Sequence, residues 1–295
     1  MTATSAPTTA EPSSLVAPQA DGDVEEGSRI TWAVRDTLAL AHRNLLHITR
    51  VPQLLVFTFI QPVMFVLLFR YVFGGAIPIP DVTYVNYLMP GIFAQTVMFG
   101  AANTAVGLAD DLGTGIIERF RSLPMARLAV LTGRTLADLA RSCVVVTVML
   151  IVGFLVGFRP DGGIPAIALG ILLVLGFAFG LSWIFANVGL RAPNAEAAQA
   201  VAFPIMFPLT FASSAFVPVN SMPGWLQGFA ANQPVTTIIN AARSLMLGPE
   251  STAALREAGV FTKSGTAYVV QAMAWIVVIV AVAAPLAVRR YRRTV

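Results

Sequence analysis

Six apolar runs divide this chain, and each reaches the roughly 20 residues that an α-helix needs to cross a bilayer. They cover residues 52–73, 84–108, 129–158, 164–190, 197–218 and 267–288. Only 12% of the residues are charged, against about 25% in a soluble domain. The segments between the runs are too short for a sizeable soluble domain. The sequence therefore predicts an all-α membrane protein with six transmembrane helices.

Basic residues are divided unequally between the two sides of such a protein. With a cytoplasmic N-terminus, 14 of the 19 basic residues fall on the cytoplasmic side, as the positive-inside rule requires. Both termini of this multi-pass chain are therefore predicted to lie in the cytoplasm, with the protein in the cell membrane. The net charge of +4 fits contact with anionic lipid of the inner leaflet. No aromatic and basic surface suggests binding of nucleic acid.

The residues before the first run form two segments. Residues 1–28 are rich in Ala, Ser, Thr, Pro and acids and contain no basic residue, which predicts a disordered cytoplasmic tail. Residues 29–50 repeat apolar side chains at helical spacing, at Val34, Leu38, Ala41, Leu45 and Ile48. This pattern predicts an amphipathic helix lying in the inner interface. The six-helix membrane domain then occupies residues 51–295.

The segment between the last two runs is too broken to span the membrane as one helix. Residues 219–247 are moderately apolar but are interrupted by Pro223, Gly224, Gly228 and Pro234. We expect short helices that re-enter the outer leaflet here, with Trp225 as an interfacial anchor. Residues 248–266 are expected to form a polar loop.

Polar and aromatic side chains in two of the runs allow two interpretations. The second run contains Gln95 and Asn103, and the fifth contains Phe203, Phe207 and Phe211 at steps of four, followed by Ser214. Such residues can serve helix packing and interhelical hydrogen bonds. They can also line a path for an apolar solute. Both interpretations stay open at this point.

No internal source of energy for transport is visible in the sequence. The single lysine, Lys263, follows no glycine-rich loop, so the chain has no P-loop for ATP. The deepest acidic residues, Asp138 and Glu196, lie at the ends of runs, whereas ion-driven carriers usually hold an ionisable residue inside the bilayer. No catalytic set, cofactor motif or metal-ligand cluster stands out. A self-sufficient carrier or channel is thus disfavoured.

A charged segment at Asp110–Arg127 separates the second and third runs. Its centre, GIIERFRSLP, combines charged side chains with apolar ones and ends at a helix-stopping proline. Further on, Arg134, Asp138 and Arg141 form a polar stripe in which Asp138 can pair with either arginine. The segment is either an interfacial helix with snorkelling arginines or a contact for a soluble partner.

Several blocks of the chain, in the right order, resemble a known family. They are IIERFRSLPMAR, GRTLADL, LSWIFA, NAEAAQAV, FPLTFASSAFVPV, MPGWLQGFA, NQPVT and PLAVRRYRR. These blocks are similar to the membrane subunit of type-2 ABC exporters, in particular the daunorubicin-resistance branch. The resemblance extends from about residue 30 to the C-terminus.

This resemblance implies a permease that pairs with a second copy of itself and with two copies of a P-loop subunit, which holds the ATP and Mg²⁺. It implies that the ATPase contacts a coupling helix formed by Glu118, Arg119, Phe120, Arg121, Leu123 and Pro124. The loop at Arg191 and Asn194 would make a second contact, and Met222, Pro223 and Trp225 would belong to the re-entrant outer helices. The expected cargo is an amphipathic drug or antibiotic. Export of a lipid, glycolipid or other envelope component is the alternative.

Overall fold

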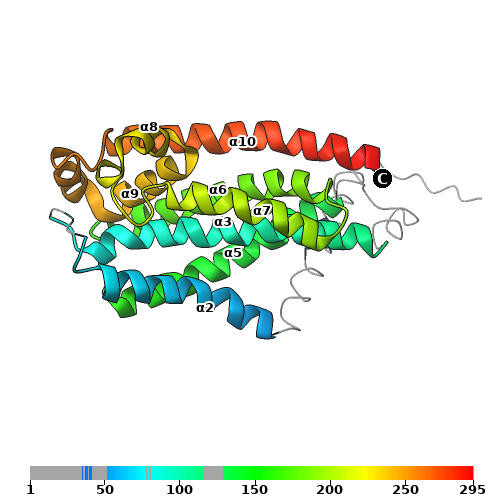
Figure 1. Ribbon diagram of the computed structural model, residues 1–295, viewed down its shortest axis with the longest axis horizontal. Helices are drawn as coiled ribbons and strands as arrows, with labels where there is room; N and C mark the ends of the chain where they lie inside the picture. The colour runs from blue at the N-terminus through cyan, green and yellow to red at the C-terminus, as the bar shows by residue number, and fades with distance from the viewer. Residues whose placement is uncertain are drawn as a thin grey trace, which may run out of the picture.

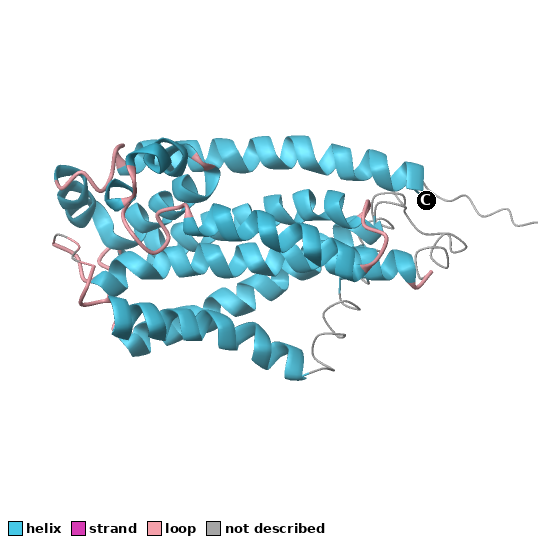
Figure 2. Cartoon of the chain, viewed as in Figure 1, coloured by secondary structure: helices cyan, strands magenta, loops and turns pink. Residues whose placement is uncertain are grey.

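The computed structural model describes residues 35, 37–38, 40–41, 52–77, 79, 81–115 and 129–294. Every regular element in these residues is a helix, which confirms the predicted all-α class (Figure 2). In chain order the long helices are α2 (Pro52–Leu68), α3 (Tyr84–Gly113), α5 (Ala129–Val156), α6 (Gly163–Gly189), α7 (Ala195–Phe211), α9 (Pro234–Glu257) and α10 (Gly265–Thr294). Shorter elements are the π-helix η1 (Phe69–Phe73), the 3-10 turn η2 (Val219–Ser221) and α8 (Gly224–Asn232).

Four helices of the described part of the chain are long and apolar enough to cross a membrane. They are α3, α5, α6 and α10. The first and fifth predicted spans correspond to shorter apolar helices, α2 with η1 and α7. The chain is therefore a membrane protein, and a count of six spans stays a prediction.

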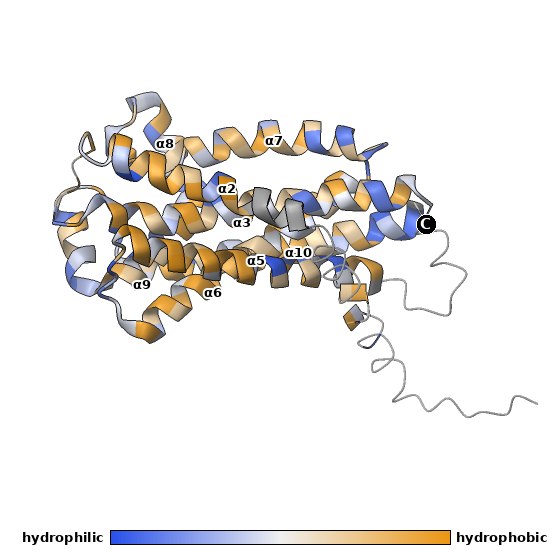
Figure 3. Cartoon of the chain, turned by 90° about the horizontal axis from the view of Figure 1, so that it is seen from below, coloured by the Kyte–Doolittle hydropathy of each residue, from blue (hydrophilic) through white to orange (hydrophobic). Residues whose placement is uncertain are grey.

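Helix α3 lies at the centre of the bundle (Figure 1). It contacts α5, α6, α7 and α9, and every residue from Tyr84 to Met98 is buried. Helix α10 packs mainly against α6 and α9, and α2 packs on the other side of the bundle against α5 and α3. Both peripheral helices consist largely of apolar residues (Figure 3), and many of these side chains are exposed, among them Met64 of α2 and Val270 and Val277 of α10. Burial of α3 on all sides gives the bundle its core.

Close contact between backbones at two glycines fixes the position of α3. A Cβ on Gly91 would lie 2.2 Å from the carbonyl oxygen of Ala215, and one on Gly189 would lie 2.6 Å from that of Ala105. Both distances are shorter than any real Cβ contact, so only glycine allows these approaches. Small residues at such contacts are typical of helices that associate in a membrane.

The bundle has two ends. At the C-terminal end, α3, α6 and α10 finish and α5 and α7 begin; η1, α8 and α9 occupy the opposite end, here called the α9 end (Figure 1). An apolar cluster at the C-terminal end joins Leu40 to side chains of α3, α5, α6 and α10. The described residues of the predicted amphipathic helix therefore pack on the bundle, with Leu40 and Ala41 buried and Leu38 exposed. The tail at 1–28 lies outside the described residues.

Two predicted boundaries were wrong. The fifth apolar run was expected to stay helical to residue 218, but α7 ends at Phe211. The side chain of Gln233 donates to the carbonyls of Leu209 and Ala212 and so satisfies acceptors that the end of a helix exposes. The expected polar loop at 248–266 is helical as far as Glu257, beyond a kink at Gly248 with φ of 80°.

Candidate functional site

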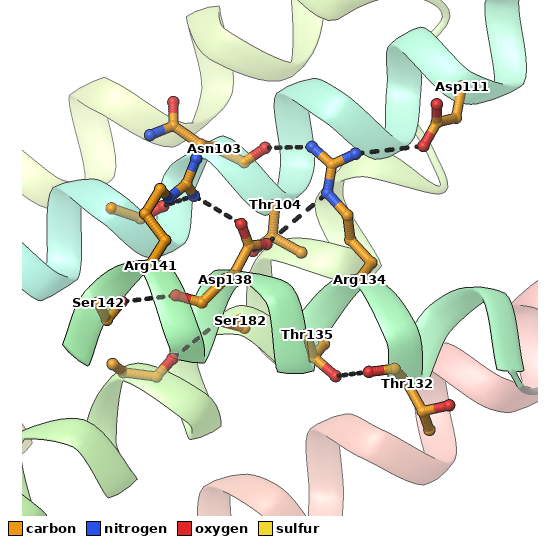
Figure 4. Close-up of polar contacts among 12 residues, drawn as sticks. Asn103, Thr104, Asp111, Thr132, Arg134, Thr135, Asp138, Arg141, Ser142 and Ser182 are labelled. Atoms are coloured by element: carbon orange, nitrogen blue, oxygen red, sulfur yellow. Dashed lines mark hydrogen bonds and ion pairs between the residues drawn. The ribbon is translucent and has the colours of Figure 1, made fainter. Parts of the chain in front are cut away.

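The predicted coupling residues, Glu118, Arg119, Phe120, Arg121, Leu123 and Pro124, lie outside the described residues. The structure does describe the two helices on either side of them, because α3 ends at Gly113 and α5 begins at Ala129. These two helices are joined by a network of charged side chains at the C-terminal end of the bundle (Figure 4).

Asp138 of α5 is the centre of this network. Its side chain is almost fully buried, and its two carboxylate oxygens point toward α3 and toward neighbouring arginines (Figure 4). Thr104 Oγ1 of α3 donates to Asp138 Oδ2 at 2.6 Å, and Arg141 Nη2 donates to Asp138 Oδ1 at 2.6 Å. Arg134 Nε lies 3.8 Å from Asp138 Oδ2. The predicted pairing of Asp138 is confirmed with both arginines.

The two arginines also reach α3 directly. Arg134 Nη1 donates to Asp111 Oδ2 at 3.2 Å, and Arg141 Nη2 donates to the carbonyl oxygen of Gly100 at 3.1 Å. A Cβ on Gly107 would lie 1.5 Å from Arg134 Nη2, so the absence of a side chain there makes room for the guanidinium. The four charges sum to zero. Each of these charges is paired with one of opposite sign, so the network buries no isolated charge.

Aromatic rings form a continuous row along α3, α7, the segment that follows α7, and η1. Phe99 of α3 contacts Phe203 and Phe207 of α7 at centroid distances of 5.8 and 5.3 Å. From Phe207 the row continues to Phe211 at a centroid distance of 5.9 Å and from there to Phe216 at 5.2 Å. Phe216 contacts Phe69 at 4.3 Å, and Phe69 contacts Phe73 at 5.2 Å. Phe207 and Phe211 are 42% and 44% exposed. The row therefore offers an aromatic surface rather than only filling the core.

The polar residues predicted for the cargo path occupy different surroundings. Gln95 is buried on α3 one turn before Phe99, and neither its amide nitrogen nor its amide oxygen has a hydrogen-bond partner among the residues that the structure describes. Asn103 is exposed, and its carbonyl oxygen accepts from Arg134 at 3.4 Å. Ser214 is buried and donates to Asn240 Oδ1 at 2.8 Å. Gln95 thus has unused hydrogen-bonding capacity beside the phenylalanine row.

Arg243 of α9 is a fully buried arginine at the α9 end of the bundle. Its Nε donates to the carbonyl of Tyr87 at 2.9 Å, and its Nη2 donates to the carbonyl of Ser214 at 2.8 Å. Its Nη1 donates to Asn240 Oδ1 at 2.7 Å, and its guanidinium lies 3.6 Å from the centroid of the Tyr87 ring. The i, i+3 pair of Asn240 and Arg243 in an apolar segment is the sequence signal for this cluster.

The remaining predicted residues lie at both ends of the bundle. Arg191 is exposed between α6 and α7, and Asn194 caps α7 by accepting from the backbone N–H of Ala197 at 2.8 Å. Both lie at the C-terminal end of the bundle, where α3 finishes and α5 begins (Figure 1). At the α9 end, Met222 is buried, Pro223 precedes α8 and Trp225 is 82% exposed. Within the described residues no group of three or more metal-type side chains is present.

Comparisons with known proteins identify the family of this chain. Residues 35–247 match the model of the ABC-2 type transporter family. A daunorubicin resistance ABC transporter permease of Streptomyces coeruleorubidus is 32% identical over 98% of both chains. A protein of Mycobacterium tuberculosis named a probable doxorubicin resistance ABC transporter permease is 28% identical over 73% of this chain and 78% of its own length. This chain therefore belongs to the ABC-2 type transporter family, as a membrane permease subunit.

Proposed function

We propose that this chain is the membrane half of an ATP-driven exporter that moves an amphipathic drug or antibiotic out of the cell. The observation that carries the proposal is the match of nearly the whole chain to a drug-resistance permease. The sequence contains no P-loop, so the ATP and Mg²⁺ belong to a separate ATP-binding subunit. Two such subunits and two permeases form the working complex.

In this proposal the C-terminal end of the bundle faces the cytoplasm. The basic residues of the chain support this orientation, since four arginines fill the last turns of α10, at Arg289, Arg290, Arg292 and Arg293. The helix α2 with η1 and the helix α7 would complete six spans, and α8 and the first half of α9 would re-enter from the outside.

The ATPase would contact the permease at two places on this cytoplasmic end. The coupling helix at Glu118–Pro124 makes the larger contact, and the turn at Arg191 and Asn194 makes the smaller one. Support for this pairing comes from the position of the described residues, because Gly189 packs against Ala105 of α3 near the start of the charged segment. The turn at Arg191 and Asn194 thus lies at the same end of the bundle as the end of α3 and the start of α5, the two helices that flank the proposed coupling helix.

The cargo would move along the phenylalanine row. Its exposed rings, Phe207 and Phe211, suit an apolar or aromatic solute, because ring stacking adds about 0.5–1.5 kcal/mol per pair to simple burial. Gln95 and Asn103 would supply hydrogen bonds for the polar part of an amphipathic molecule. Ser214 would lie where the row meets the α9 end.

A reconstitution tests this function. The permease is inserted in liposomes with and without the soluble ATPase that copurifies with it, and uptake of daunorubicin is followed by fluorescence. We expect uptake that requires both the ATPase and ATP. Uptake without the ATPase would favour a self-sufficient carrier instead. ATP-dependent transfer of a fluorescent glycolipid without any uptake of daunorubicin would favour export of an envelope component.

A further inference from the structure

The function proposed above assigns no role to the charged network between α3 and α5. Its members that join the two helices are Thr104, Asp111, Arg134, Asp138 and Arg141, here called the α3–α5 clasp. We infer that the clasp makes α3 and α5 move as one body and so carries movement of the segment between them to the cargo path. This inference rests on the proposed function, because it concerns how that exporter is coupled.

The contacts of the clasp run in antiparallel order along the two helices. Arg141 reaches the carbonyl of Gly100, and further along α3 Asp138 meets Thr104 and Arg134 meets Asp111. A slip of α3 against α5 by one helical turn, about 5.4 Å, breaks all three contacts at once. The clasp therefore defines one register between the helices.

These charges fix the register of α3 against α5 rather than adding to the stability of the protein. Burying ions in a membrane domain is costly, and replacing a buried ion pair with apolar residues is often neutral or stabilising. The ion pair that joins the two helices is Arg134 with Asp111, because Arg134, Asp138 and Arg141 all lie on α5. A movement of α3 against α5 separates this pair and takes Thr104 away from the carboxylate of Asp138, which is only 4% exposed. The helices flanking the predicted coupling residues thus resist moving independently.

The clasp contacts the part of α3 that lines the proposed cargo path. The carbonyl that Arg141 binds belongs to Gly100, the residue next to Phe99. The ring of Phe99 contacts Phe203 and Phe207 on α7, at 5.8 and 5.3 Å between centroids. A shift of the α3–α5 pair therefore shifts one wall of the phenylalanine row against the other. In this role the clasp residues are positioning residues, since none of them needs to touch cargo or ATP.

Two variants and two controls test the inference in the complete complex with its ATPase. Thr104→Val removes one hydroxyl that bridges the helices, and Asp138→Asn removes the central charge. Thr104→Ser keeps the bridging hydroxyl. Ser142→Ala removes a hydroxyl from the same turn of α5 whose hydrogen bond, to the carbonyl of Asp138 at 2.8 Å, stays within that helix.

The measured quantity is the number of daunorubicin molecules transported per ATP hydrolysed, in liposomes that contain equal amounts of assembled complex. For Thr104→Val and Asp138→Asn we expect this ratio to fall about tenfold, within the usual range of coupling between two sites. For Thr104→Ser and Ser142→Ala we expect the ratio of the wild type. A merely structural role would lower the yield of complex, or both rates together, and leave the ratio unchanged.

The possible outcomes separate the inference from the proposed function. An unchanged ratio in Thr104→Val overturns the transmission role of the clasp, even if Asp138→Asn fails to assemble. A wild-type complex that hydrolyses ATP without moving daunorubicin, a glycolipid or any other tested cargo overturns the proposed function, and the transmission role with it. A lowered ratio in Ser142→Ala as well would assign the effect to α5 itself and not to its bonds with α3.

Discussion

At Arg243, the substitution usually regarded as conservative should cost more stability than a substitution that removes the charge. We expect Arg243→Lys to destabilise the protein more than Arg243→Met. The guanidinium serves three acceptors at once, at 2.9, 2.7 and 2.8 Å. A lysine is a compact ammonium on a shorter reach and does not reproduce this planar fork.

The magnitude follows from what each variant leaves behind. In Arg243→Met every acceptor keeps another donor, because Ser214 Oγ donates to Asn240 Oδ1 at 2.8 Å and Tyr87 Oη donates to the carbonyl of Ser214 at 3.3 Å. The carbonyl of Tyr87 lies inside α3, where the backbone ladder supplies a donor. We therefore expect a loss of about 1–3 kcal/mol from the missing interactions. In Arg243→Lys the buried charge remains but cannot reach all three acceptors. A hydrogen bond to a charged group contributes about 1.5–3 kcal/mol, so the loss of two costs about 3–6 kcal/mol.

The assay is equilibrium unfolding of the purified protein in mixed micelles, followed by tryptophan fluorescence. Arg256 provides matched controls because it lies on the same helix and is exposed. Arg256→Lys and Arg256→Met should each change the free energy of unfolding by less than about 0.5 kcal/mol. The reasoning is refuted if Arg243→Met proves the less stable of the two Arg243 variants, or if both behave like the Arg256 controls.

Three further predictions concern packing, the cargo path and coupling. Gly91→Ala should destabilise the bundle by about 1–3 kcal/mol, because the new Cβ meets the backbone of Ala215. Gly228→Ala should be neutral or stabilising, because its Cβ meets no atom within 4 Å. Equilibrium unfolding in micelles compares the two variants, and equal effects would contradict the close approach at Gly91. Gln95→Leu should raise stability by about 1–3 kcal/mol by removing unpartnered polar atoms from the core, and should lower daunorubicin transport; a loss of stability would show that the amide has a partner. Glu118→Ala and Arg121→Ala should leave assembly intact but reduce transport per ATP, and unchanged drug-stimulated hydrolysis and efflux in both variants would remove these residues from the coupling contact.

The sequence is sufficient to predict the long helices, because crossing a bilayer demands a length and a composition that few other structures require. The predicted run at 164–190 corresponds to α6 at Gly163–Gly189. The end of α7 was missed because it depends on Gln233, a side chain far along the chain that binds the last carbonyls of the helix. The helix after Gly248 was missed because polar composition was taken to indicate a loop.

The charged residues show a similar contrast. Asp138 and its arginines could be paired from sequence because they lie at steps of three and four on one helix face. The contacts across to Thr104 and Asp111 could not, since they depend on the register between two helices. Arg243 gave little signal because two of its acceptors are backbone carbonyls, and a carbonyl is present at every position of any sequence.

The burial of α3 also has a consequence for how the protein is made. The membrane-spanning window of α3 is 72% buried inside the bundle, against 11% for that of α10. Polar side chains such as Gln95 and Thr104 are acceptable in α3 only once α5, α6, α7 and α9 surround it. During synthesis, however, α3 leaves the ribosome before all four of those helices. The complete burial of these polar side chains must therefore wait for the rest of the chain, and we expect a nascent chain that stops after α5 to leave α3 exposed to lipid on the sides that α6, α7 and α9 later cover.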